Sequence, residues 1–150
     1  MSSTQTHVLI RCSSCRTLNR VAKDKILVSP QCGECKNTLT FPVKPLDIGS
    51  SSFQKEVLDW AGAVLIDFWS PTCGYCLRLN PLLDELAYEK RGLLKIVKVN
   101  TAIEQSLAAG FQIRGVPALF LYQNGKKMGE MAGALPKKQL EEWVFKTVGV

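Results

Sequence analysis

Six cysteines carry most of the chemistry available to this sequence, and each of them belongs to a C-x-x-C pair. The pairs are Cys12-Ser13-Ser14-Cys15, Cys32-Gly33-Glu34-Cys35 and Cys73-Gly74-Tyr75-Cys76. A C-x-x-C pair supplies half of a tetrahedral metal site, or it forms a disulfide that opens and closes. The surroundings of each pair indicate which of these two uses applies.

The first two pairs have the spacing of a zinc site. Sixteen residues separate Cys15 from Cys32, which fits the C-x₂-C-x₁₅₋₂₀-C-x₂-C pattern. Two tight turns can present Cys12, Cys15, Cys32 and Cys35 to one ion, and we expect Gly33 to supply the positive φ of such a turn. Disulfides, free thiols or an iron ion are the alternatives. We expect zinc, which would supply much of the folding free energy of so small a module.

The third pair lies where a strand gives way to a helix. The apolar run Ala63–Trp69 predicts a central strand buried on both faces, and the leucines of segment 77–88 predict a long helix. Free backbone N–H groups and the helix dipole stabilise a thiolate at a helix start, so Cys73 is predicted to have a lowered pKa and to attack. Cys76, one turn further, would close the disulfide. The alternative is two core cysteines.

The chain divides into parts that position these pairs. Residues 1–41 predict a zinc ribbon, residues 42–50 a linker and a possible first edge strand, and residues 51–150 a larger α/β domain. In the larger part we expect a helix from Ser51 or Ser52 to about Trp60, strand 63–69, helix 77–88 kinked at Pro81, strand 93–99, helix 103–109, strand 118–122, a turn at Asn124-Gly125, strand 126–132 and a last helix from Pro136. This order predicts a mixed central sheet with helices on both faces.

Residues 63–76 resemble the active-site segment of the thioredoxin family. Further matching segments, in the family's order and spacing, are Pro81, Lys98-Val99-Asn100, Arg114-Gly115-Val116-Pro117, Asn124-Gly125 and Gly133-Ala134. The resemblance extends over about residues 44–150, and the four-cysteine segment before it is similar to the zinc ribbon of one bacterial thioredoxin type. The resemblance to the thioredoxin family implies a thioredoxin-like fold and an enzyme that reduces disulfides of protein substrates. It also implies that a thioredoxin-reductase-like electron donor reduces the enzyme again.

The resemblance also implies roles for single residues. Cys73 would attack a target disulfide and Cys76 would then displace the target thiol. Asp67, a carboxylate within an apolar strand, would be a buried acid or base for Cys76 with Lys98 as its partner, although a paired buried polar group is the alternative. The implied substrate-binding residues are Trp69, Gly74, Val116, Pro117 and Gly133. Pro117 would be a cis-proline beside the dithiol, although a proline that begins a strand is the alternative.

Composition and charge limit the other function classes. The chain has 150 residues, of which 46% are hydrophobic, and no apolar run is long enough for a membrane helix. The presence of a single histidine, His7, argues against histidine-rich metal sites and against Ser-His or Cys-His catalysis. We expect His7 in a solvated tail rather than as a metal ligand. Without a secretory signal pattern near the N-terminus, paired thiols point to a reducing cytoplasm.

A net charge of +6 raises the question whether the protein binds nucleic acid. The basic residues of the ribbon have no aromatic residues between them before Phe41, so we expect a solvated face rather than a nucleic-acid surface. No feature predicts an oligomer, and we expect a monomer. Two other functions stay open: a thiol oxidase or disulfide isomerase, since Thr72 and Tyr75 are unusual beside such a dithiol, and a partner-binding ribbon with a redox-sensing domain.

Overall fold

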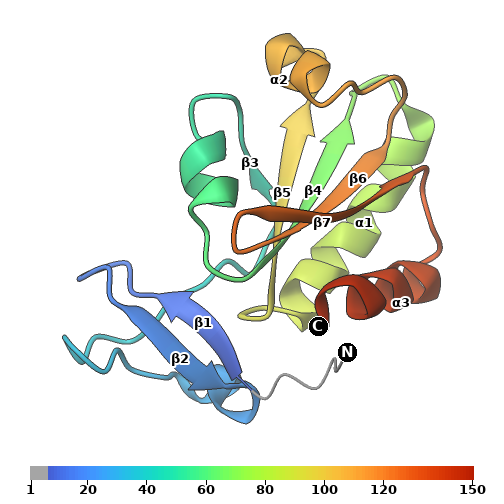
Figure 1. Ribbon diagram of the computed structural model, residues 1–150. Helices are drawn as coiled ribbons and strands as arrows, with labels where there is room; N and C mark the ends of the chain where they lie inside the picture. Colours follow the sequence, from blue (N-terminus) through green and yellow to red (C-terminus); the bar gives the residue numbers. More distant parts are fainter. Residues whose placement is uncertain (1–6) are drawn as a thin grey trace.

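The computed structural model describes residues 7–150 as a small N-terminal module beside a larger domain (Figure 1). The module contains an antiparallel hairpin of β1 (His7–Arg11) and β2 (Leu18–Ala22), followed by the 3₁₀ helix η1 (Lys23–Val28). Gln31 and Thr38 form a further antiparallel bridge around the second C-x-x-C pair. His7 is not in a tail, because it opens β1 and pairs in register with Ala22.

The larger domain is built on one mixed five-stranded sheet, as predicted. Its strands are β3 (Leu46–Asp47), β4 (Ala63–Trp69), β5 (Leu94–Asn100), β6 (Ala118–Gln123) and β7 (Lys126–Ala132). Their order in the sheet is β3-β5-β4-β6-β7. β3 and β4 run parallel to β5, whereas β6 is antiparallel to both β4 and β7. The central position of β4 agrees with its apolar run, since six of its seven residues are buried.

Helices cover both faces of this sheet (Figure 1). One face packs against α1 (Gly74–Glu89) and α3 (Lys137–Val148), and the other packs against the π-helical turn η2 (Gln54–Leu58) and α2 (Gln105–Gly110). Side chains of a strand alternate between faces, so Leu65 belongs to the α1 and α3 core while Ile66 and Phe68 belong to the other core. Asp67 lies two residues after Leu65 and therefore faces the same side of the sheet, toward α1.

Local hydrogen bonds explain where helix bounds differ from those predicted. The helix expected up to Trp60 is only the short η2, because the Asp59 N–H bonds to the Gln54 carbonyl and the Gln54 amide donates to the Asp59 carboxylate at 2.9 Å. The helix expected from residue 103 begins at Gln105, since Asn100 Oδ1 accepts from the Ala102 N–H and its carbonyl accepts from Glu104. α3 begins at Lys137, with Pro136 as its N-cap.

The ribbon packs against the end of the sheet that lies opposite the third cysteine pair. Ile26 of η1 and Phe41 share a hydrophobic cluster with Leu93, which precedes β5. Gly92 has a φ of +83°, and a Cβ at this position would collide with Ile26 Cγ2. Lys23 adds a hydrogen bond of 3.2 Å to the Gly149 carbonyl. These contacts join the ribbon to segments far away in the sequence.

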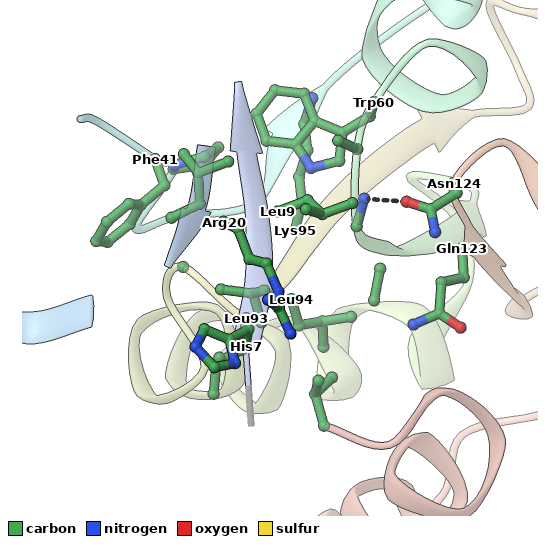
Figure 2. A pocket seen from close by; sticks show the side chains of 18 residues that line it. His7, Leu9, Arg20, Phe41, Trp60, Leu93, Leu94, Lys95, Gln123 and Asn124 are labelled. Atoms are coloured by element: carbon green, nitrogen blue, oxygen red, sulfur yellow. Dashed lines mark hydrogen bonds between the residues drawn. The ribbon is translucent and has the colours of Figure 1, made fainter. Parts of the chain in front are cut away.

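A cavity of about 450 Å³ lies at this junction (Figure 2). Figure 2 shows that its lining comes from both parts of the chain, with His7, Leu9 and Arg20 from the ribbon and Trp60, Leu94 and Asn124 from the larger domain. The buried Lys95 forms part of its wall, ion-paired with Glu56 and with its ammonium 3.6 Å from the centre of the Trp60 ring. Among residues 7–150, no helix is long and apolar enough to cross a membrane.

Candidate active site and metal centre

The third cysteine pair lies at the carboxyl end of β4, where α1 begins. The Cys73 N–H bonds to the Ser70 carbonyl at 3.1 Å, which closes the turn after the strand. Cys73 is the N-cap of α1, and its sulfur accepts the Cys76 N–H at 3.1 Å. The two cysteines form a disulfide in which Cys73 is half-buried and Cys76 is fully buried. The accessible sulfur therefore belongs to the cysteine predicted to attack.

A loop from the other side of the sheet meets this dithiol. The carbonyl oxygen of Val116 lies 3.6 Å from Cys73 Sγ, and the Val116–Pro117 peptide is cis. Gly133 donates its N–H to the Pro117 carbonyl at 2.9 Å, which ties this loop to the end of β7. A cavity of about 430 Å³ is lined by residues 111–118 and 130–133, and the space over Gly74 is open. Of the predicted substrate-binding residues, Val116 thus lies beside Cys73, with Pro117 next to it in the chain and Gly133 bonded to Pro117.

Asp67 is fully buried on the face of β4 that packs against α1, the helix that begins at the dithiol. Neither carboxylate oxygen has a hydrogen-bond partner among residues 7–150. Burial raises the pKa of Asp67 to about 7, while the positive charge of Lys98 acts in the opposite direction. A carboxyl group with this pKa exchanges its proton near neutral pH, which is what a proton acceptor for a thiol requires.

Lys98 lies next to Asp67 in the sheet but bonds elsewhere. The two residues are register partners on β5 and β4. The Lys98 ammonium donates to Asn80 Oδ1 at 2.5 Å and lies 4.9 Å from the centre of the Trp69 ring. The sequence interpretation paired Lys98 with Asp67 and overlooked Asn80. Its position four residues after Cys76, on the same face of the predicted helix, is the signal that would have found it.

The other four cysteines form one cluster in the ribbon. Their sulfurs all lie within 4.8 Å of one another, with 3.6 Å between Cys12 and Cys35 and 3.5 Å between Cys15 and Cys32. Four sulfurs around one zinc ion, at about 2.3 Å from the metal, form a tetrahedron with edges of about 3.8 Å. The cluster therefore fits a tetrahedral ion of this size.

Two similar turns hold these sulfurs. The Ser14 N–H bonds to Cys12 Sγ and the Glu34 N–H to Cys32 Sγ, both at 3.4 Å. Each turn closes through a residue of positive φ, Arg16 at 70° and Lys36 at 68°. The expectation that Gly33 supplies this conformation is therefore wrong; the Gly33 N–H instead bonds to Asn19 Oδ1 at 2.9 Å.

Donated hydrogen bonds favour the thiolate form at two of these cysteines, Cys12 and Cys32. The backbone N–H of Cys35, helped by the side chain of Asn19 and the N–H of Glu34, lowers the pKa of Cys32 to about 6. At Cys35 the bond from the Asn37 N–H is outweighed by burial and the neighbouring thiols, which raise the pKa to about 11. Thiolates are the form in which cysteine binds a metal ion. The donor set and its hydrogen bonds are thus suited to a divalent metal.

Comparison with known proteins assigns both parts of the chain. Residues 44–146 match the thioredoxin family model. The chain belongs to the thioredoxin family. Residues 11–37 match the model of the zinc ribbon described as the N-terminal part of thioredoxin 2, which covers all four cysteines of the ribbon cluster.

Relatives and solved structures agree with this membership. The chain is 30% identical over 137 residues to thioredoxin C-3 of Corynebacterium nephridii, covering 91% of this chain and 93% of the relative. Thioredoxin 1 of a Nostoc species is 39% identical over 99 residues, covering 66% of this chain and 92% of that protein. The structure of a point mutant of a Halobacterium salinarum thioredoxin superposes with a TM-score of 0.67 at 27% identity, covering 73% of this chain and 95% of that chain.

These matches and the dithiol at the start of α1 define the class of reaction. The thioredoxin domain is a thiol–disulfide oxidoreductase, and its activity is the reduction of protein disulfides. The matches favour neither the thiol-oxidase or isomerase alternative nor the alternative of a binding module with a redox sensor.

Proposed function

We propose that Cys73 and Cys76 perform this reduction in two steps. The Cys73 thiolate attacks one sulfur of a target disulfide, forms a mixed disulfide and releases the first target thiol. The Cys76 thiolate then attacks Cys73 Sγ, which closes the intramolecular disulfide and releases the second target thiol. Two electrons pass to the target, and a thioredoxin-reductase-like donor returns them. The observation that carries this assignment is the half-buried Cys73 at the start of α1 with Cys76 fully buried behind it.

Asp67 is the proposed acceptor of the Cys76 proton. Cys76 must become a thiolate before it attacks, and it is shielded from bulk water. Asp67 is the buried carboxylate on the α1 face, and its raised pKa leaves it a competent base near neutral pH. Lys98 modulates this base through its charge.

Five residues form the proposed binding surface for a target chain. The Val116 carbonyl at 3.6 Å from Cys73 Sγ is placed to pair with an extended target next to the reacting sulfur. The other four residues of this proposed surface are Trp69 at the end of β4, Gly74, Pro117 and Gly133, and the open space over Gly74 leaves room for the target backbone.

For the ribbon we propose one bound zinc ion, held by Cys12, Cys15, Cys32 and Cys35. Its spacing, its sulfur cluster and its family match support this role. We propose a ribbon of residues 1–41, a linker of residues 42–50 that includes the edge strand β3, and a thioredoxin domain of residues 51–150. A cytoplasmic, monomeric protein that transports electrons to disulfide-containing proteins, without nucleic acid or membrane as partner, fits these features.

A trapping experiment tests the two thiol roles. The Cys76→Ser variant is expected to accumulate mixed disulfides with target proteins, since attack proceeds and resolution does not. The Cys73→Ser variant is the matched control and should trap none. Both variants are incubated with an oxidised protein substrate such as insulin and separated by non-reducing electrophoresis. Trapping by Cys73→Ser instead would reverse the two roles.

A further inference from the structure

Three charged residues lie in one row across the sheet, near the carboxyl end of β4. Lys98 on β5 is the register partner of Asp67 on β4 and of Asp47 on β3. A lysine between two aspartates would ordinarily form an ion pair with one of them. Among residues 7–150, however, Lys98 makes no salt bridge, and Asp67 has no hydrogen-bond partner.

Asn80 of α1 accounts for this arrangement. Its Oδ1 accepts a hydrogen bond of 2.5 Å from the Lys98 ammonium, which also lies over the Trp69 ring at 4.9 Å. Hydrogen bonds from charged donors are stronger than neutral ones, and an aromatic face attracts a cation. Two contacts therefore fix the ammonium at a place where it touches neither aspartate.

The residues around Asp67 include one cation, Lys98, so the position of its ammonium has a large effect on the proton affinity of the carboxylate. From β5 the charged neighbour is Lys98, and on α1 the buried titratable residue is Cys76. From β6 the same face receives Leu119 and Leu121, which are apolar. Asp47 is exposed on the far side of Lys98. Among residues 7–150, Lys98 is the only residue whose charge lowers the pKa of Asp67 against the effect of burial.

We propose that Asn80 is a positioning residue for the redox reaction: it holds the Lys98 ammonium against Trp69 and away from Asp67, and so preserves the carboxylate as acceptor of the Cys76 proton. An ammonium in direct contact would stabilise the ionised carboxylate and weaken it as a base. The proposal rests on the proposed role of Asp67, but it makes a separate claim about what sets the proton affinity of that residue.

The test measures Asp67 directly and without turnover. The full-length, zinc-loaded protein is oxidised, so that Cys73 and Cys76 do not titrate, and the Asp67 carboxyl carbon is followed by NMR against pH. In Asn80→Ala, Lys98 is released toward Asp67, and we expect the titration midpoint to fall by about one pH unit, a tenfold loss of proton affinity. In Asn80→Asp, which keeps an acceptor for Lys98 and adds a negative charge, the midpoint should stay or rise.

A double variant shows whether Asn80 acts through Lys98. Lys98→Met removes the cation, so adding Asn80→Ala to it should cause no further shift in the Asp67 midpoint. An unchanged midpoint in Asn80→Ala, or an equal shift in the presence and absence of Lys98, would overturn the proposal. Failure of the Asp67 role itself gives a different result, namely unchanged resolution kinetics in Asp67→Asn whatever the midpoint in the Asn80 variants.

Discussion

The ribbon and the dithiol use the same C-x-x-C spacing on two different backbones. In the ribbon, the residue after each pair has a positive φ and the chain turns back, so that the sulfurs of both pairs meet within 4.8 Å. At Cys73 the chain instead continues into α1, which leaves one sulfur accessible and buries the other. The backbone conformation in which the chain leaves the pair, and not the spacing of the cysteines, therefore separates a metal site from a redox site.

The two regions also differ in what holds them together. The buried cluster of the ribbon has six residues, and two of them, Cys12 and Cys32, are proposed metal ligands. Among residues 7–150, the hydrophobic cluster on the α1 face of the thioredoxin sheet alone has fourteen buried residues, none of them a cysteine. We infer that the ribbon depends on its metal for folding, whereas the thioredoxin domain depends on its apolar core.

The largest expected effect is that one variant loses zinc but keeps activity, whereas the other loses activity but keeps zinc. Cys32→Ser removes a proposed ligand and should lose the zinc ion, while disulfide reduction stays within about threefold because the dithiol lies at the opposite end of the sheet. Cys73→Ser should keep one zinc per chain and lose at least about 10³-fold in turnover, as expected when a nucleophile is removed. Elemental analysis and an insulin-reduction assay measure the two properties on the same samples. A full complement of metal in Cys32→Ser would refute the ligand assignment.

The second prediction concerns the pH dependence of stability. The pKa of Asp67 is about 7 in the folded protein and about 3.8 in the unfolded chain, so the carboxyl costs stability progressively as the pH rises from about 4 to about 7. Three pKa units correspond to about 4 kcal/mol, all of which Asp67→Asn should recover at pH 8 and none at pH 3.5. Urea melts of the oxidised parent and variant at both pH values check this sign. A variant that is less stable than the parent at pH 8 would show that Asp67 is paired after all.

The third prediction tests the junction between the two regions. Ile26 is 3% exposed and packs against Gly92 and Leu93, so Ile26→Ala should lower the free energy of unfolding of the ribbon by about 2–3 kcal/mol. Leu27→Ala is the matched control, since Leu27 is 64% exposed and should change the stability by less than about 0.5 kcal/mol. Amide hydrogen exchange on the zinc-loaded protein resolves the ribbon from the sheet. Equal effects of the two variants would mean that the ribbon does not dock through Ile26.

Much of this organisation follows from the sequence because local rules agree with each other. The run Ala63–Trp69, the breaking residues after it and the leucines of α1 all indicate the same strand–turn–helix unit around Cys73. The cis-proline loop was predicted through the family resemblance, since periodicity says nothing about which loop meets which helix.

The features that were not predicted depend on side chains that are distant in the sequence. The hydrogen bond of Lys98 to Asn80 needs the distance between β5 and α1, which no local pattern contains. The helix expected up to Trp60 is shorter than predicted, because the hydrogen bond from the Gln54 side chain to the Asp59 carboxylate stabilises a π-helical turn. The docking of Ile26 against Gly92 likewise joins segments that share no periodic pattern.

The most direct measurement of the central claim counts thiols and zinc during oxidation. The reduced, zinc-loaded protein is titrated with a stoichiometric thiol oxidant, and free thiols under denaturing conditions and bound zinc are determined at each step. If one type of pair is a redox site and the other a metal site, two of the six thiols disappear while one zinc per chain is retained. Release of zinc in step with the loss of the first two thiols would contradict the separation of the two sites.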